Sequence, residues 1–408
     1  MDSDDEVLVI LAAYVAAKEN EDLSNIKGQS KRRRPNCWVN PYLQLRKEKG
    51  RFQNDFQNMV QNPTMFYQNF NMNESEFNNL FSLVEPHLVP KRNSRPDAIP
   101  LRAKLAIALE YFATGDLQCH VGSTYRISKQ HMGRTIDLVS DAISTALHGE
   151  FPKWNSENML KWATDFMEHW HFPNCIGAID GKHVAIRAPP NSGNAFHNSK
   201  GFHSIMLMAV CDASYRFTYI DVGAYGSETE MTAFSHCSLG KAILSGNVAF
   251  PEDSMLQGVR TPYYIVADEA FQLHKRIMKP YGARKLSKSE RIFNYRLSRA
   301  RRCIEKAFGI LSKRWMAVQD TLRCGPDRAQ NVTVACCYLH NYLMRVSPRE
   351  YGARVESPLM QSPADPAAES FRGRVQDFPK HVRNTIRDYV NSAVGSVPGQ
   401  NESAGVLH

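Results

Sequence analysis

The sequence predicts an α/β protein in which a mixed sheet covered by helices follows an all-helical N-terminal half. Before Pro173 the apolar residues recur at spacings of three and four, which is the period of an amphipathic helix. After Pro173, short apolar runs bounded by turn residues indicate strands, and a long helical pattern over residues 287–315 follows the last of them. This order of strands and helices is typical of a mixed sheet that helices cover.

The composition is that of a folded protein with an excess of positive charge. The 408 residues are 43% hydrophobic, which excludes a wholly disordered chain and allows one sizeable core plus smaller modules. Lys and Arg total 50 against 41 Asp and Glu, so the net charge is +9. An excess of this size favours polyanionic partners such as nucleic acid.

Cysteine usage and the apolar segments indicate the compartment. The nine cysteines contain no C-x-x-C pair, so a disulfide scaffold is not expected and a reducing compartment fits. The apolar stretch 7–17 follows an acidic run, and it is shorter than the ~20 apolar residues of a membrane span. We therefore expect a soluble intracellular protein with no membrane partner.

Residues 1–36 form a predicted mobile arm that carries a basic cluster. The cluster is Lys31, Arg32, Arg33 and Arg34, closed by Pro35. Such a run is typical of a nuclear localisation signal or of an arm that binds phosphates, and the alternative is a solvated group of charges. We expect the first function, and with it a nuclear protein that also passes through the cytoplasm.

The helical half divides into two predicted regions, residues 37–99 and 100–150. Asn73 followed by Glu76 predicts a capped helix in the first region. In the second, a helix is followed by a short connector and by another helix that begins at Ser128. Lys129 and Arg134 project from the first turns of that helix, which is how a helix-turn-helix presents DNA-contacting residues. A plain helical hairpin is the alternative.

The sheet domain is predicted to span residues 172–346. Its strands are expected at 175–186, 205–211, 217–222 and 263–267, with helices at 287–315 and 332–343. Residues 347–408 are rich in Pro and Ser, so we expect a mobile tail that contains one short helix over 382–390.

Three carboxylates lie next to these elements. Asp180 is inside the first strand, Asp268 directly follows the fourth, and Glu305 lies in the long helix beside its apolar stripe. A carboxylate inside a central strand is costly unless it is paired or bound to a metal. Ligands of open α/β sheets bind where Asp268 is expected, at the carboxyl end of a strand. Strand-end Asp and helix-surface Glu are also everyday features, so convergence of the three is a hypothesis.

If the three acids converge, they predict a site for Mg²⁺ or Mn²⁺. Two carboxylates about 4 Å apart repel by roughly 4 kcal/mol at an effective dielectric of 20, so three require cations. Oxygen ligands select hard cations rather than zinc. Two such ions bridged by a shared Asp clamp the attacking and the leaving oxygen of a phosphodiester displacement.

The surroundings of Glu305 are strongly basic. Residues 275–328 contain 16 Lys and Arg against four acids, and a track along a phosphate backbone requires such single-sign density. The candidates for DNA contact here are Arg299, Arg301, Arg302 and Lys306.

Four segments resemble the nuclease of PIF/Harbinger DNA transposons and its domesticated animal relatives. They are AIDGKHVAIRAPPNSG from Ala178, YIDVGAYGSETEMTAF from Tyr219, YYIVADEAFQL from Tyr263 and ERIFNYRLSRARRCIEKAFGILSKRW from Glu290. The resemblance runs from about residue 38 to residue 343. It implies an RNase H-like fold with a mixed five-stranded sheet, so that residues 172–346 are a DDE nuclease domain.

The resemblance also implies a catalytic, metal-binding triad of Asp180, Asp268 and Glu305, with a two-metal site for Mg²⁺ or Mn²⁺. The implied reaction is hydrolysis of double-stranded DNA at transposon ends, followed by strand transfer to target DNA. It further implies a Myb-like accessory protein and a homo-oligomer on DNA. The alternative function is a domesticated DNA- or chromatin-binding adaptor that does not cleave.

Further residues near these motifs are candidates for the site. Glu230 stands near the place where many relatives carry an Asp, and His183 follows Asp180 by three residues. Asp221, inside the third strand, is interpreted as a structural acid. Cys337 and His340 have the spacing of half a zinc site, but no second pair accompanies them, so we interpret them as core residues.

Overall fold

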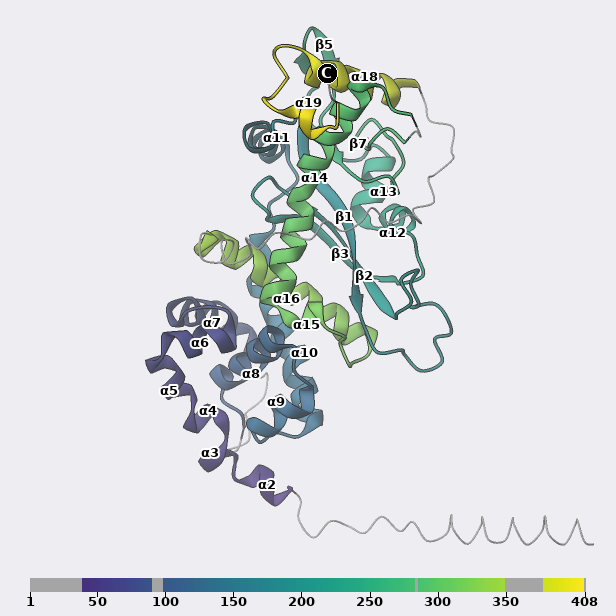
Figure 1. Ribbon diagram of the computed structural model, residues 1–408. Helices are drawn as coiled ribbons and strands as arrows, with labels where there is room; N and C mark the ends of the chain where they lie inside the picture. Colours follow the sequence, from purple (N-terminus) through teal and green to yellow (C-terminus); the bar gives the residue numbers. More distant parts are fainter. Residues whose placement is uncertain (1–38, 90–97, 283–284, 349–376, 407–408) are drawn as a thin grey trace, which may run out of the picture.

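The computed structural model describes residues 39–89, 98–282, 285–348 and 377–406, so the basic cluster at residues 31–34 lies outside the described part. Figure 1 shows a helical part, drawn in purple and blue, below a part that contains the sheet. The long helix α14 (Lys288–Arg314) runs down the sheet toward the helical part. The predicted α/β class is confirmed.

The helical part begins with short helices rather than long ones. Their bounds are α2 Pro41–Gln44, α3 Arg46–Lys49, α4 Arg51–Asn54, α5 Phe56–Gln61, α6 Pro63–Phe70 and α7 Glu74–Leu88. The rings of Phe56, Phe66, Phe70 and Phe77 pack together with centroids 4.7 to 5.9 Å apart, which gives this part its core. The predicted capping box at Asn73 is confirmed by both of its hydrogen bonds.

Three helices then form the unit that resembles a helix-turn-helix. They are α8 Leu101–Thr114, α9 Gln118–Thr124 and α10 Lys129–Ala146, and the Ser128 side chain caps α10 as predicted. A buried polar network ties α8 to its neighbours, since Glu110 accepts hydrogen bonds from Arg51 at 2.7 Å and from the Tyr125 hydroxyl at 2.6 Å. Beyond its first turns, α10 packs against α7, α8 and α16 (Pro326–Val346).

The sheet has the strand order β3-β2-β1-β6-β7. The bounds of these strands are β1 Cys175–Ala185, β2 Ser204–Cys211, β3 Phe217–Tyr225, β6 Tyr264–Val266 and β7 Ile277–Met278. β1, β2 and β3 are antiparallel neighbours, whereas β6 is parallel to β1 and β7 is parallel to β6. This mixed five-stranded sheet agrees with the expected RNase H-like fold. A separate hairpin joins β4 Ser254–Leu256 to β5 Val259–Thr261.

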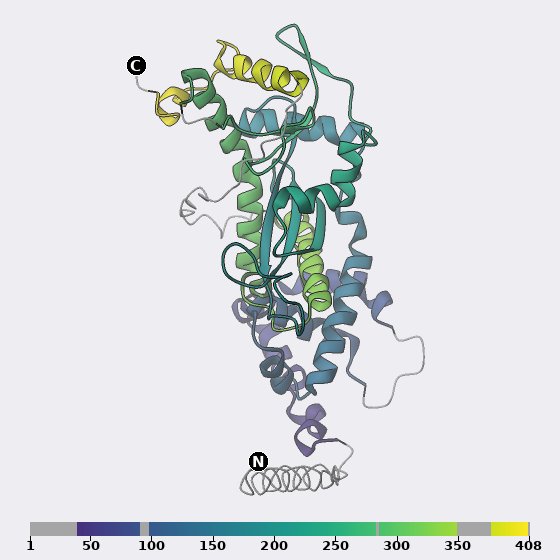
Figure 2. The same cartoon turned by 90° about the vertical axis from the view of Figure 1, so that its right-hand side faces the viewer.

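Helices cover both faces of the sheet, as the sequence predicts. One core cluster joins Ala178 of β1 to α14 and α16, and a second joins Ile179 to the opposite layer. That layer consists of α11 Ser156–Trp170, α12 Glu230–His236 and α13 Ser238–Leu244. In Figure 2 the green ribbon of α14 runs along one side of the strands. The strand pairing shifts between Cys175 and Gly177, and Ile176 lies in the second cluster while Ala178 lies in the first.

The C-terminal segment differs from the predicted mobile tail. Two helices, α18 Asp377–Asn391 and α19 Gln400–Ser403, pack against the N-terminal half of α14, as the yellow ribbon in Figure 1 shows. Arg296 of α14 is fully buried beneath them. It donates hydrogen bonds to the Gly395 carbonyl at 2.9 Å, to Gln400 Oε1 at 2.8 Å and to the His171 carbonyl. Residues 377–406 are therefore part of the folded domain.

An ion pair connects the helical part to the domain that contains the sheet. Arg328 of α16 donates two hydrogen bonds to the Asp137 carboxylate of α10, both at 2.7 Å. Two parallel bonds of this kind fix orientation as well as distance.

No helix in the described ranges is long and apolar enough to cross a membrane.

Candidate functional site: an acidic cluster beside a basic helix

The site lies where β1 continues past its neighbour. β1 pairs with β6 only as far as Ala178, because β6 ends at Val266, while β1 continues to Ala185 alongside β2. Asp180 therefore stands at an open edge of the sheet. Asp268 follows the end of β6 by two residues and comes to the same edge.

Three carboxylates meet at this edge. One oxygen each from Asp180, Glu230 and Asp268 lies within 4.8 Å of the others. Glu230 is the first residue of α12 and reaches the edge across Gly181. A Cβ atom at position 181 would lie 2.9 Å from Glu230 Cγ, so the absence of a side chain there leaves room for the Glu230 carboxylate.

Gly181→Ala is expected to weaken Mn²⁺ binding about tenfold while leaving the protein folded, because Glu230 must move away from the other two acids. Isothermal titration calorimetry gives the affinity. Gly149→Ala is the matched control, since a Cβ atom there meets no atom within 4 Å. Equal affinities of the two variants would contradict the role of Gly181.

The donor set suits a hard divalent cation. The Gly181 amide donates to Asp180 Oδ1 at 2.8 Å, and the Ala270 amide donates to Asp268 Oδ1 at 2.9 Å, so both carboxylates are held in place. Glu230 Oε2 is buried, and no described residue donates a hydrogen bond to it. An unsatisfied buried carboxylate oxygen among other carboxylates is the environment that Mg²⁺ or Mn²⁺ relieves.

Burial and mutual repulsion shift the proton affinities of these acids. Burial raises the pKa of Glu230 to about 9, and the charges of Asp180 and Asp268 add to that rise. Burial also raises the pKa of Asp180 to about 6, while the charge of Arg301 opposes the rise. At neutral pH, Glu230 is therefore protonated when no cation is present.

Binding of Mn²⁺ at about pH 7 is expected to release roughly one proton, because a cation requires Glu230 as the carboxylate. Neutral pH lies below the raised pKa of Glu230, so the side chain carries a proton before the ion binds and loses it when the ion binds. The proton release disappears as the pH passes about 9, because Glu230 is then already ionised. Calorimetric titrations in buffers of different ionisation enthalpy measure the released protons. Glu230→Gln is the control and should lose most of the release; a buffer-independent enthalpy in the unmodified protein would contradict the protonated state.

Glu305 lies outside the group of three. Its side chain is 49% exposed on α14, and Arg301, one helical turn earlier, separates it from Asp180. Arg301 Nη2 is 3.5 Å from Asp180 Oδ2 and 3.9 Å from Glu305 Oε1. The assignment of Glu305 to a metal-binding triad with Asp180 and Asp268 therefore stays a prediction.

The other predicted neighbours have structural partners. His183 Nδ1 is 2.9 Å from the Ser204 hydroxyl, and burial lowers the His183 pKa to about 4. Asp221 accepts a hydrogen bond of 3.4 Å from the Tyr219 hydroxyl. His340 is buried with Nε2 2.8 Å from the Tyr215 carbonyl, so it is a core residue as interpreted. Within the described residues, the group around Asp180 is the only cluster with metal-ligand spacing.

The six candidate DNA-contacting residues lie on α10 and α14, and one of them, Arg301, belongs to the acidic site. Lys129 and Arg134 are exposed on the first turns of α10, and Arg302 is exposed on α14. Arg299 and Lys306 are half-buried on α14, and Lys306 lies over the Tyr215 ring at 5.7 Å. The exception is Arg301, predicted as a DNA contact: it points into the acidic site, because its position on α14 faces β1 rather than solvent.

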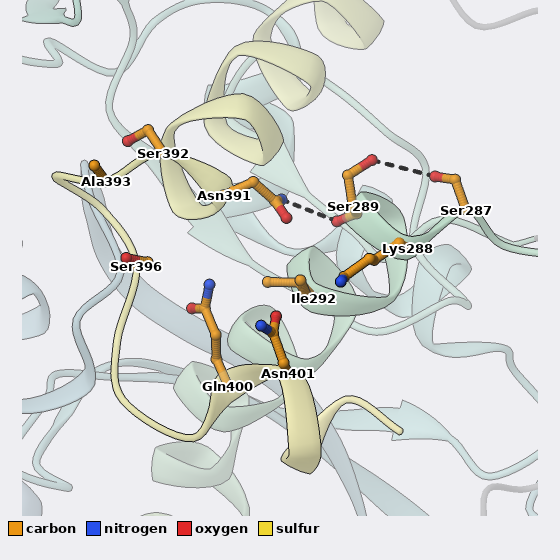
Figure 3. Close-up of a pocket in the computed structure, with 10 residues that line it drawn as sticks. All are labelled: Ser287, Lys288, Ser289, Ile292, Asn391, Ser392, Ala393, Ser396, Gln400 and Asn401. Atoms are coloured by element: carbon orange, nitrogen blue, oxygen red, sulfur yellow. Dashed lines mark hydrogen bonds between the residues drawn. The ribbon is translucent and has the colours of Figure 1, made fainter. Parts of the chain in front are cut away.

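Two pockets lie away from the acids. A pocket of about 200 Å³ at the start of α10 brings Lys129 together with Arg187 and Arg323 of the sheet domain, and Asp116 and Asp320 also line it. A second, polar pocket of about 580 Å³ lies between the start of α14 and the C-terminal helices. In Figure 3 the side-chain amide of Asn391 donates a hydrogen bond to the backbone carbonyl of Ser289 at the wall of this pocket. None of the four acids lines either pocket.

The sequence predicts Glu230 as a possible neighbour of the site and Arg301 as a DNA contact, and the structure places Glu230 among the acids and Arg301 beside Asp180. The glycine after Asp180 is a signal that a side chain approaches β1 there. Arg301 precedes Glu305 by four residues, and this spacing indicates an ion pair on one helix face. Neither signal predicts which acid of another element lies next to Glu230 or Arg301 in the folded protein.

Comparison with known proteins agrees with this geometry. The profile of the DDE superfamily endonuclease family matches residues 179–341, which include all four acids. The rat protein named "Putative nuclease HARBI1" is 27% identical over 285 residues, covering 67% of this chain and 75% of its own length. "Protein ALP1-like" of Arabidopsis thaliana is 26% identical over 353 residues, covering 84% of this chain and 83% of its own. No solved structure is significantly similar to the chain.

Proposed function

Because the chain belongs to the DDE superfamily endonuclease family, we propose that it is a divalent-metal-dependent DNA endonuclease of the PIF/Harbinger type. The observation that carries the proposal is the meeting of Asp180, Glu230 and Asp268 at the open edge of the sheet. They come from three elements far apart in the sequence, and nothing in the packing of the core requires three acids at one point.

Asp180, Glu230 and Asp268 are the residues that would hold the ion. When bound, a divalent cation supplies positive charge that activates water and stabilises the leaving oxygen of a phosphodiester. The backbone amides of Gly181 and Ala270 keep two of the carboxylates oriented before any ligand binds. Glu230 would have to lose its proton to the solvent in order to hold the ion.

A stripe of exposed residues on α14 is the proposed track for the DNA backbone. Arg291, Arg302 and Lys313 are exposed along the same side of the helix as Glu305. Lys129 and Arg134 extend the positive surface to the start of α10. Cations spaced along two elements fit the regular spacing of phosphates on a duplex.

The finer functions also rest on the family resemblance. We propose that the protein acts at transposon ends and transfers the freed 3′-hydroxyl strand to target DNA. The corresponding partners are a Myb-like accessory protein and further copies of this chain assembled on DNA. Import through the basic cluster at residues 31–34 would place the reaction in the nucleus.

A nicking assay tests the proposal. The purified full-length chain is expected to nick duplex DNA that carries the inverted repeats of its element when Mg²⁺ or Mn²⁺ is present, and to stop when the metal is chelated. Binding to the duplex without metal should weaken with salt with a log-log slope near −7, about eight phosphates being neutralised. Nicking that persists in chelator, or a flat salt dependence, would refute the proposal.

A second candidate function is a DNA- or chromatin-binding adaptor that does not cleave. The ion pairs of Arg301 with Asp180 and Glu305 favour it, because a guanidinium already neutralises these acids. An adaptor would bind the duplex with the same salt dependence and show no nicking at any Mn²⁺ concentration.

A further inference from the structure

Arg301 is a cation at the centre of the acidic site. Its side chain is 18% exposed, and its guanidinium lies between Asp180 and Glu305. The charges of Asp268 and Glu230 also act on it. One guanidinium thus interacts with the charges of four acids.

The contacts of Arg301 are long and incomplete. Nη2 reaches Asp180 Oδ2 at 3.5 Å and Glu305 Oε1 at 3.9 Å, and no described residue accepts a hydrogen bond from its buried Nε. Elsewhere the same chain forms a bidentate pair, in which Arg328 contacts both oxygens of Asp137 at 2.7 Å. Charge-assisted pairs of good geometry have distances of about 2.7–2.9 Å, so Arg301 is held by charge rather than by a fitted hydrogen-bond network.

We propose that Arg301 is a placeholder cation in the DNA-free protein, and that Asp180 and Glu305 accept a divalent ion between them only after its guanidinium has moved away. This inference rests on the proposed function. The site then has two ion positions. The first lies among Asp180, Glu230 and Asp268, and the second lies between Asp180 and Glu305, the two acids that Arg301 contacts. The oxygens of Asp180, Glu230 and Asp268 that lie within 4.8 Å of one another would hold the first ion, which needs no ligand from Glu305.

The backbone of DNA is the partner that draws Arg301 out. A guanidinium fork matches phosphate oxygens in the same way as it matches a carboxylate. Arg302 and Glu305 are exposed beside it, so a phosphate on this face of α14 is within reach of the Arg301 side chain after a rotamer change. Binding of the duplex therefore frees Asp180 and Glu305 for a second ion and places the guanidinium on the phosphate.

Titration of Mn²⁺ into the full-length chain without DNA, followed by electron paramagnetic resonance, tests the placeholder. The unmodified protein is expected to bind one ion that Asp180→Asn removes. Arg301→Met should bind a second ion at least about tenfold more tightly than the unmodified protein does, because a positive charge next to the site is gone. Arg301→Lys keeps the charge and should behave as the unmodified protein. Lys288→Met, which removes an exposed cation at the start of the same helix, is the matched control and should leave Mn²⁺ binding unchanged.

A second titration needs no variant of Arg301. A short phosphorothioate duplex, corrected for the Mn²⁺ that it binds alone, should add a second ion to the unmodified protein but not to Glu305→Gln. Identical ion binding by Arg301→Met and the unmodified protein, or no additional ion with the duplex, would overturn the inference. Metal-dependent nicking together with either result leaves the proposed function standing, whereas loss of all Asp180-dependent Mn²⁺ binding removes both.

Discussion

Asp180→Asn is expected to lower the rate of metal-dependent nicking by about three orders of magnitude or more, because a single carboxylate serves both halves of the site. One oxygen of Asp180 lies within 4.8 Å of oxygens of Glu230 and Asp268, and its Oδ2 is 3.5 Å from Arg301 Nη2. Asparagine has the same shape and keeps one acceptor oxygen, so the loss reports charge rather than packing. Single-turnover nicking rates at saturating Mn²⁺ measure the effect.

Asp221→Asn is the matched control for this prediction. Asp221 is a half-buried acid on β3, and it accepts a hydrogen bond from the Tyr219 hydroxyl. Its substitution should change the nicking rate by less than about threefold. If Asp180→Asn nicks as fast as the unmodified protein while the salt-dependent DNA binding persists, the cluster is structural and cleavage takes place elsewhere.

Arg296→Ala is expected to lower the free energy of unfolding by about 3 kcal/mol. The Arg296 side chain is fully buried and donates to three carbonyl oxygens, of His171, Gly395 and Gln400. Truncation leaves those acceptors without a donor and opens a cavity under the C-terminal helices. Urea denaturation followed by circular dichroism measures the change.

Arg299→Ala separates this effect from a general loss of charge on α14. Arg299 is half-buried on the same helix, and its substitution should cost less than about 1 kcal/mol. The Arg296 variant should also expose residues 377–406 to limited proteolysis, since that arginine holds them to α14. Equal stabilities of the two variants would mean that the C-terminal helices dock without Arg296.

Much of the fold could be predicted because its signals are local. Asn73, Ser128 and Ser287 cap helices through hydrogen bonds within three residues, and the structure contains each cap. The first three strands carry apolar runs long enough to show their period. β7, by contrast, has only two residues, Ile277–Met278, so no pattern identifies it, and the fifth strand was expected from the family resemblance alone.

The site could be predicted only in part, because its geometry depends on contacts between distant segments. Asp180 and Asp268 were found from their places in and after strands, which the strand order brings together. Whether Glu230 or Glu305 stands closer to them depends on how α12 and α14 cross the edge of the sheet. That crossing is set by packing over many residues, and no short stretch of sequence encodes it. The folded C-terminal segment was missed for the same reason, since its docking partner Arg296 lies about 100 residues away.

The two hydrogen bonds between Arg328 and Asp137 fix the distance between the helical part and the acidic site. They clamp α10 to α16, and α16 packs on the sheet that carries Asp180, so the two ends of the molecule keep one separation and one angle. A base sequence read by the first turns of α10 would then lie at a constant offset from the bond that is cut. Five extra base pairs inserted in that interval would rotate the bond by half a turn to the far side of the duplex, whereas ten would restore its facing.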